Sequence, residues 1–189
     1  MNYFVIGRED NPNYPLLEDF DRETSKAVCM DEFIPDGFHC IFEVDLDNSD
    51  SPKVPSMVDY HKEPAPVVSK KIKDILEPLE LKGVQFVPAE IRWKDKVYKD
   101  YFYMHVIVYH QCADKENSII KFSNIDGTIR RISKFVINPK LADIPLEDRL
   151  IFRCKEGAFY YFVEESLKDK IMAANPKGIV FIPAEEWTK

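Results

Sequence analysis

Two glutamates at corresponding positions of an internal repeat are the first candidates for chemistry. Residues 82–90 read KGVQFVPAE, and residues 177–185 read KGIVFIPAE, a shift of 95 positions. If the two copies pack about a pseudo-twofold axis, Glu90 and Glu185 could face each other at the separation used for glycoside hydrolysis. Solvated strand ends are the simpler interpretation, because a repeated folding unit keeps its turn residues for folding reasons. We therefore favour a structural role for both.

Histidines and cysteines offer further combinations. His105 and His110 are five residues apart on an apolar stretch, so on a strand they point to opposite faces, whereas metal ligands must converge. His39 and Cys40 are adjacent, so they also point apart, and a nucleophile needs its base within hydrogen-bond reach. The four cysteines include no Cys-x-x-Cys pair, which favours reduced thiols, although their even number leaves disulfides open.

Common enzyme motifs are missing from the sequence. There is no Gly-x-Gly-x-x-Gly, no Gly-Lys-Ser/Thr and no Gly-x-Ser-x-Gly, so phosphate-cradling loops and a nucleophile elbow have no support. We predict no catalytic residue, no metal ligand and no cofactor. An enzyme becomes less favoured but stays an alternative.

The composition describes a folded domain. Of 189 residues, 45% are hydrophobic and 13% aromatic, which is enough to bury a core. The net charge of -7 argues against nucleic acid and anionic membranes as partners. No apolar run of about 18 residues and no signal-like start occur, so we expect a cytoplasmic protein that does not enter a membrane.

Acidic charge is concentrated near the N-terminus. Residues 1–60 hold 14 Asp and Glu against 4 Lys and Arg, whereas the other 129 residues hold 19 acids and 22 bases. This segment is a candidate docking surface for a basic protein, with aromatic anchors for affinity; the alternative is a solvated loop region. The predicted partner-binding residues are Tyr14, Glu18, Asp19, Phe20, Asp21, Glu23, Phe38, Asp45, Asp47 and Asp50. We expect Asp19, Asp21 and Glu23 to be exposed. The turn at residues 93–96 is a weaker candidate, with a hairpin tip as its simpler interpretation.

Hydrophobic periodicity predicts an α+β fold with a predominantly antiparallel sheet. Alternation favours strands at residues 3–7, 39–44, 84–88 and 98–110, and a hairpin of residues 118–122 and 128–137. A helical stripe runs through residues 67–79 with Ser69 as cap, and a second short helix covers residues 165–174. The two short helices belong to an internally duplicated helix-turn-strand unit, at about 67–90 and 162–185. We expect an acidic, loop-rich segment over 1–60 with two or three strands and an α+β domain over 61–189, packed as one compact unit.

The order of these motifs resembles a known family. A helix leads into residues 82–88, followed by residues 98–106, residues 151–153 and a second helix leading into residues 176–183. This order is similar to immunity protein family eleven of bacterial polymorphic toxin systems, from about residue 60 to the C-terminus. The resemblance implies a mostly β-structured cytoplasmic protein that binds and neutralises a cognate toxin, without a cofactor or a settled catalytic residue. The alternatives are a hydrolase that reverses a toxin's modification and a general protein-interaction adaptor.

Overall fold

The computed structural model describes residues 2–46, 52, 54–125 and 129–188. The chain forms two compact units that interleave along the sequence. Unit 1 comprises residues 1–7, 108–173 and 180–189, and unit 2 comprises residues 8–107 and 174–179. The boundary expected at residue 60 lies inside unit 2, and a separate acidic segment stays a prediction.

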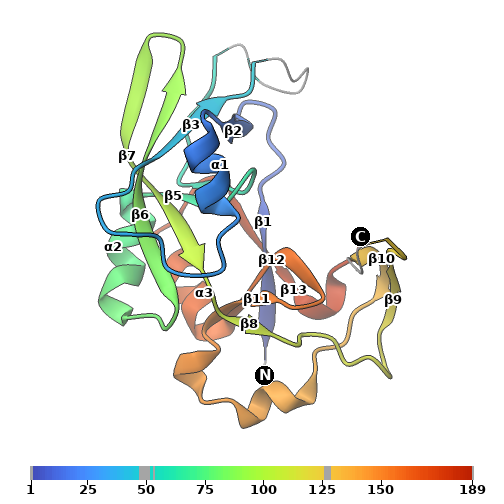
Figure 1. Ribbon diagram of the computed structural model, residues 1–189. Helices are drawn as coiled ribbons and strands as arrows, with labels where there is room; N and C mark the ends of the chain where they lie inside the picture. The colour runs from blue at the N-terminus through green and yellow to red at the C-terminus, as the bar shows by residue number, and fades with distance from the viewer. Residues whose placement is uncertain (1, 47–51, 53, 126–128, 189) are drawn as a thin grey trace. The chain divides into compact units, whose positions relative to one another are not determined.

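Unit 2 is built on a six-stranded sheet (Figure 1). Only β3 and β6 run parallel; the other neighbouring pairs are antiparallel. In spatial order the strands are β2 (Leu17–Asp19), β3 (Cys40–Val44), β6 (Val84–Trp93), β7 (Lys96–Val106), β5 (Val67–Ser69) and β4 (Tyr60–His61).

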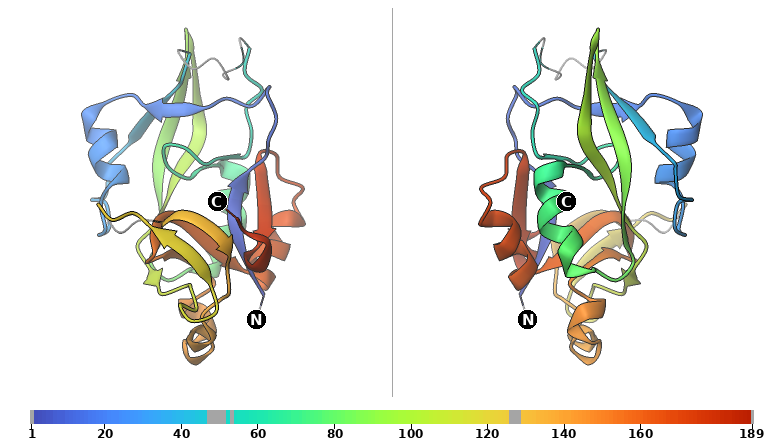
Figure 2. Two further views of the ribbon diagram at one scale, coloured as in Figure 1. Left: turned by 90° about the vertical axis from the view of Figure 1, so that its right-hand side faces the viewer. Right: turned by 90° about the vertical axis from the view of Figure 1, so that its left-hand side faces the viewer.

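Two α-helices belong to unit 2. The predicted helix is confirmed as α2 (Lys70–Leu76), which buries Ile72 and Leu76 and continues as the 3-10 turn η1 (Glu77–Leu79). It lies beside the long β6–β7 hairpin in the right view of Figure 2. The other helix, α1 (Arg22–Val28), was not predicted. Its seven residues bury only Thr24 and Ala27, so it is too short and too polar to show a helical period.

One face of the unit 2 sheet forms the core. Cys40, Phe42 and Ile91 are fully buried within a cluster that also includes Ala27 of α1. Because side chains alternate along a strand, the residues between them, such as Ile41 and Glu43, occupy the opposite face and are only half-buried. This alternation places polar groups of β3 on an accessible face.

Two predicted strands have different bounds in the structure. The stretch expected as one strand over residues 98–110 divides into β7 and the short β8 (Tyr109–His110), which belongs to unit 1. The strand expected to end at Pro88 instead runs to Trp93. Pro88 is tolerated inside β6 because β3 pairs with β6 only from Ala89 onward. The N–H that Pro88 lacks is therefore not needed for the hydrogen bonds between β3 and β6.

Unit 1 contains a five-stranded sheet and a separate hairpin. The hairpin of β9 (Ile119–Phe122) and β10 (Ile129–Lys134) confirms the prediction for this region. In the sheet the spatial order is β13 (Ile179–Pro183), β1 (Tyr3–Arg8), β12 (Gly157–Glu164), β11 (Ile151–Cys154) and β8. Its helical elements are α3 (Glu165–Met172), η2 (Pro139–Asp143), η3 (Leu146–Asp148) and η4 (Ala184–Glu186).

Each unit contains a strand–helix–strand crossover with one strand inserted between its two strands. In unit 2, β5–α2–β6 flanks β7; in the sheet of unit 1, β12–α3–β13 flanks β1. Glycines with positive φ, Gly83 at 66° and Gly178 at 84°, precede the second strand in both. Duplication as the origin of this shared order stays a prediction.

The fold class is confirmed as α+β with mostly antiparallel strands, although the residues that the structure describes form three α-helices and not the two expected. Within the described part of the chain, no helix has the length and apolar character needed to cross a membrane.

Candidate partner-binding surface

The edge strand β2 carries acids on both faces of the unit 2 sheet. It pairs with β3 so that Glu18 lies opposite Glu43, and Asp19 lies opposite the buried Phe42. Glu18 and Asp19 therefore point to opposite faces. Because they are opposite each other, Glu18 and Glu43 share the face that points away from the core, and this edge of the sheet carries acidic side chains.

The negative edge continues onto β6. Glu43 is in register with Arg92, and Ile41 with Glu90. Arg92 bonds Glu90 through Nε and Nη2, at 2.8 and 2.7 Å from Oε1, and its guanidinium lies 4.2 Å from the ring centre of Phe20. We call Glu18, Phe20, Glu43, Glu90 and Arg92 the acidic sheet face.

Two other predicted acids, Asp21 and Glu23, belong to α1 or to its N-terminal cap. Asp21 caps α1 by accepting the Thr24 N–H at 2.7 Å, and Glu23 forms an exposed ion pair with Lys26 at 2.8 Å. The expectation that Asp21 is a freely exposed charge was wrong, since a helix cap fixes its side chain. Replacing it would alter the stability of α1 together with any surface charge.

Asp19 is also less exposed than expected. Burial raises the pKa of its carboxyl, the nearby Asp21 raises it further, and a hydrogen bond with Ser25 lowers it. Its Oδ1 is buried and meets no hydrogen-bond partner among the described residues. Asp19 is therefore a poor choice for a surface mutation, whereas Glu18 next to it is exposed.

The remaining predicted residues are dispersed. Tyr14 is half-buried in the turn of residues 11–14, where its carbonyl accepts Arg8 Nη2 at 2.8 Å. Phe38 is half-buried against the core, so packing accounts for it. Asp45 follows β3 and donates its N–H to the Leu16 carbonyl at 3.0 Å, beside β2. Asp47 and Asp50 lie outside the described residues.

Sequence reasoning missed two residues of this region. Glu43 was read only as part of a strand, although its place between core positions in an alternating pattern indicated an outward side chain. Phe33 is 54% exposed, more than Phe20 at 43%. Its loop is held in place because Gln85 bonds both the N–H and the carbonyl of Ile34, at 2.9 and 2.7 Å. An exposed aromatic on a fixed loop is a typical binding anchor.

The charge of the chain follows the two units. Counted over all residues, unit 2 carries 21 acids and 14 bases, a net of -7, whereas unit 1 carries 12 of each and is neutral. In unit 1 the β9–β10 hairpin even presents a basic surface, with Lys121, Arg130 and Arg131 exposed around one hollow. A basic partner is therefore attracted to unit 2 rather than to unit 1.

Histidine and cysteine chemistry in unit 2 has a structural explanation. Cys40 is buried in the core and His39 is exposed, as their adjacency on a strand predicted. Burial, with help from Asp19 and Asp21, raises the pKa of the Cys40 thiol to about 12, which disfavours a thiolate nucleophile. His105 holds the loop before β3 in place through a hydrogen bond between its Nε2 and the Glu32 carbonyl, at 2.9 Å.

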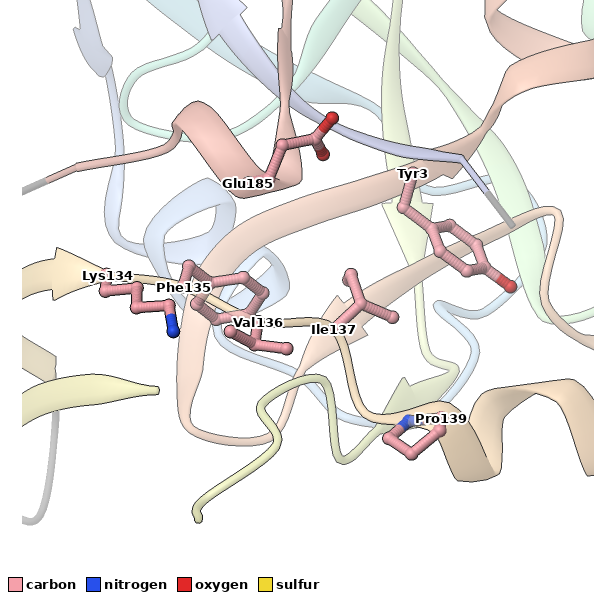
Figure 3. Close-up of a pocket in the computed structure, with 7 residues that line it drawn as sticks. All are labelled: Tyr3, Lys134, Phe135, Val136, Ile137, Pro139 and Glu185. Carbon is pink, nitrogen blue, oxygen red and sulfur yellow. The ribbon is translucent and has the colours of Figure 1, made fainter. Parts of the chain in front are cut away.

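The two repeat glutamates occupy different environments. Glu90 lies within β6 in unit 2 and is bonded to Arg92, whereas Glu185 lies in η4 of unit 1. Glu185 borders a hollow of about 420 Å³ lined mainly by residues 134–137 (Figure 3). Tyr3 also lines it, but its hydroxyl accepts Arg149 Nη1 at 2.7 Å and points away from Glu185 in Figure 3. Among the described residues that line this hollow, none besides Glu185 carries a carboxylate.

His110 and the turn of residues 93–96 also have structural roles. His110 Nε2 lies 2.9 Å from the Asp148 carbonyl, within unit 1. The turn is the tip of the β6–β7 hairpin, as its simpler interpretation held. Trp93 is buried there, with the ammonium groups of Lys94 and Lys96 each 5.2 Å from its ring centre.

Comparison with known proteins identifies the family. The model of the immunity protein family (Imm11) matches residues 34–186. The motifs that carry the resemblance are structural: residues 82–88 enter β6, residues 98–106 lie in β7, and residues 151–153 lie in β11. Among curated proteins, no relative matches this chain. Because the match covers most of the chain and its motifs occupy the core strands of both units, the chain belongs to the immunity protein family Imm11.

Proposed function

We propose that this protein binds a cognate toxin of a bacterial polymorphic toxin system in a one-to-one complex in the cytoplasm and neutralises it by occupying its surface. The family supplies the toxin–immunity role. The acidic sheet face is the observation that supports the proposed mode of binding, because Glu18 and Glu43 lie opposite each other on one accessible face and together attract a cationic partner.

The partner is expected to be basic where it meets unit 2. Glu18 and Glu43 would steer encounter with lysine or arginine side chains of the toxin, since exposed charges act over about 8 Å at physiological ionic strength. Phe20 and Phe33, both exposed aromatics of unit 2, would supply desolvated contact area. Asp45, beside β2, extends the same edge. Neutralisation then follows from binding and needs no catalysis by this chain.

The test measures association with the C-terminal domain of the toxin-like protein encoded by the neighbouring gene. We expect Glu18→Lys combined with Glu43→Lys to slow association at least about tenfold at low salt and to flatten its salt dependence. The matched control is Asp143→Lys combined with Glu147→Lys, which makes the same charge change at exposed sites of unit 1. Unchanged association in the first variant, with an unchanged thermal melt, would remove the acidic sheet face from the interface.

The hydrolase alternative has its own test. Glu185→Gln leaves unit 2 untouched, so binding should persist and protection against the toxin should persist with it. Lost protection in a variant that still binds would mean that the chain acts as an enzyme.

A further inference from the structure

Three potential metal ligands from separate parts of the sequence converge in unit 1. Cys112 follows β8, Cys154 ends β11, and Glu156 lies in the turn between β11 and β12. The parallel pairing of β8 with β11 sets Cys154 beside His110. Continuing that register by two residues brings Cys112 beside Glu156.

The side chains complete this convergence. The two sulfurs and a carboxylate oxygen all lie within 4.8 Å of one another. Glu156 Oε2 accepts the Cys112 N–H at 3.0 Å and the Cys154 thiol at 3.3 Å. Both cysteines are fully buried. Two hydrogen bonds thus hold the glutamate beside the two cysteines, while the Cys112 thiol donates to the His110 carbonyl at 3.2 Å.

One atom of the cluster is left without a partner. Glu156 Oε1 is buried and meets no hydrogen-bond donor among the described residues. Cys112 and Cys154 belong to an apolar core that also contains Phe135 and Ile129. A buried carboxylate oxygen without a donor is costly, and a bound cation is one arrangement that removes the cost.

We propose that Cys112, Cys154 and Glu156 bind a zinc ion. Two sulfurs and one carboxylate oxygen form a ligand set that Zn²⁺ accepts, with a fourth tetrahedral position for water. On binding, both thiols release their protons to solvent and become thiolates. The two new thiolate charges balance the charge of the dication, so binding leaves the net charge of the site unchanged.

The ion would stabilise the attachment of β8 to the sheet of unit 1. β8 has only two residues and joins the sheet edge through two register positions on β11. An ion bound by Cys112, Cys154 and Glu156 would link the chain after β8 to the end of β11 and to the β11–β12 turn. The ion would enter at this turn, where Lys155 is exposed and Glu156 is only half-buried.

The experiment titrates Co²⁺ into the reduced, metal-free full chain, because Co²⁺ occupies zinc sites and shows thiolate charge-transfer absorption. We expect near-ultraviolet charge-transfer bands that saturate at one equivalent, disappear on addition of Zn²⁺, and accompany a rise in melting temperature with Zn²⁺. Two protons should be released per Zn²⁺ bound in weakly buffered solution.

Matched variants assign the ligands. Cys112→Ser and Cys154→Ser should each abolish the bands, and Glu156→Gln, which keeps both thiols, should weaken Zn²⁺ binding at least about tenfold. Cys40→Ser is the control, because Cys40 is equally buried but lies in unit 2. Absence of charge-transfer bands in the folded parent chain would overturn the proposal. So would bands that persist in Glu156→Gln at unchanged affinity, or that vanish in Cys40→Ser.

Discussion

The crossovers of the two units share an order of elements but end differently. In unit 2, β6 continues past the Pro-Ala-Glu sequence for three more residues and pairs there with β3. In unit 1, β13 ends at Pro183 and the same sequence turns into η4. Glu90 therefore joins a sheet face, whereas Glu185 lies on a 3-10 turn. The repeated sequence therefore occurs in the same strand–helix–strand order in both units. The environment of its glutamate differs because β3 pairs with β6 in unit 2, whereas β13 ends at Pro183.

The two units also differ in charge. The acidic sheet face forms where β6 meets β3 and β2, an edge that the unit 1 crossover lacks. Unit 1 is neutral and unit 2 carries the net negative charge, so the two units differ in charge although they share the crossover. The comparison between the units can be tested by substitutions at matched positions.

The largest effect is expected in the middle strand of the unit 2 crossover. Val106 in β7 has no exposed surface, so Val106→Asp should lower the free energy of unfolding by about 4 kcal/mol through a buried charge without a partner. Val97→Asp on the same strand is the control, because Val97 is 47% exposed and the change there should stay within about 0.5 kcal/mol. Chemical denaturation measures both, and equal losses would show that β7 is not the central support of unit 2.

The glycine turns should respond unequally. At Gly178 a Cβ would lie 2.7 Å from Val58 Cβ and 2.8 Å from the Tyr60 carbonyl oxygen, so Gly178→Ala should cost about 3 kcal/mol from strain and overlap together. Gly83→Ala should cost about 1 kcal/mol from the positive φ. Chemical denaturation measures both losses, provided that the dependence of the unfolding free energy on denaturant is the same in the two variants. A larger loss of stability in Gly83→Ala than in Gly178→Ala would contradict this prediction.

Acid sensitivity should arise in unit 2 from His61. Burial, reinforced by the positive charge of Arg8, lowers the pKa of His61 to about 4, although the Pro15 backbone raises it. In the unfolded chain the histidine binds its proton near pH 6.5, whereas in the folded protein it does so only near pH 4. The folded state is therefore fully stable above pH 6.5, and its free energy of unfolding falls by about 3 kcal/mol as the pH is lowered to 4.

Unfolding measured at pH 7 and pH 4 in the parent and in His61→Phe isolates this contribution. Phenylalanine retains a ring beside Tyr101, whose ring centre lies 5.7 Å away, but cannot titrate. The pH dependence of the variant should be flatter in this window. An identical pH profile would assign the acid sensitivity to other groups.

The smallest effect concerns helix caps. Asp21 accepts an N–H of α1, so Asp21→Ala should cost about 1 kcal/mol. Ser69 makes no side-chain cap bond to α2 and instead donates to Asp59 Oδ1 at 2.8 Å. Comparing Asp21→Ala with Asp21→Asn in thermal melts identifies the cap, since asparagine restores it. If asparagine is as destabilising as alanine, the carboxylate charge is what matters.

The sequence by itself determined the elements that show a strong local period. The stripe of Ile72 and Leu76 defined α2, and alternation through residues 39–44 defined β3, because burial on one face imposes these spacings. It also located the acidic region and the family. It missed α1, which has too few buried residues for a period, and it ended β6 at Pro88, because the reach of β3 is not a local property.

Only the tertiary structure decided which residues share a face or a cluster. Strand register put Glu18 opposite Glu43 and separated Asp19 from Glu18, since neighbours on a strand alternate. It also brought Cys112 to Cys154 and Glu156 from more than forty positions away, although their spacing matches no metal motif. Register depends on which strands pair across the fold, so residue types and local spacing do not specify such sites.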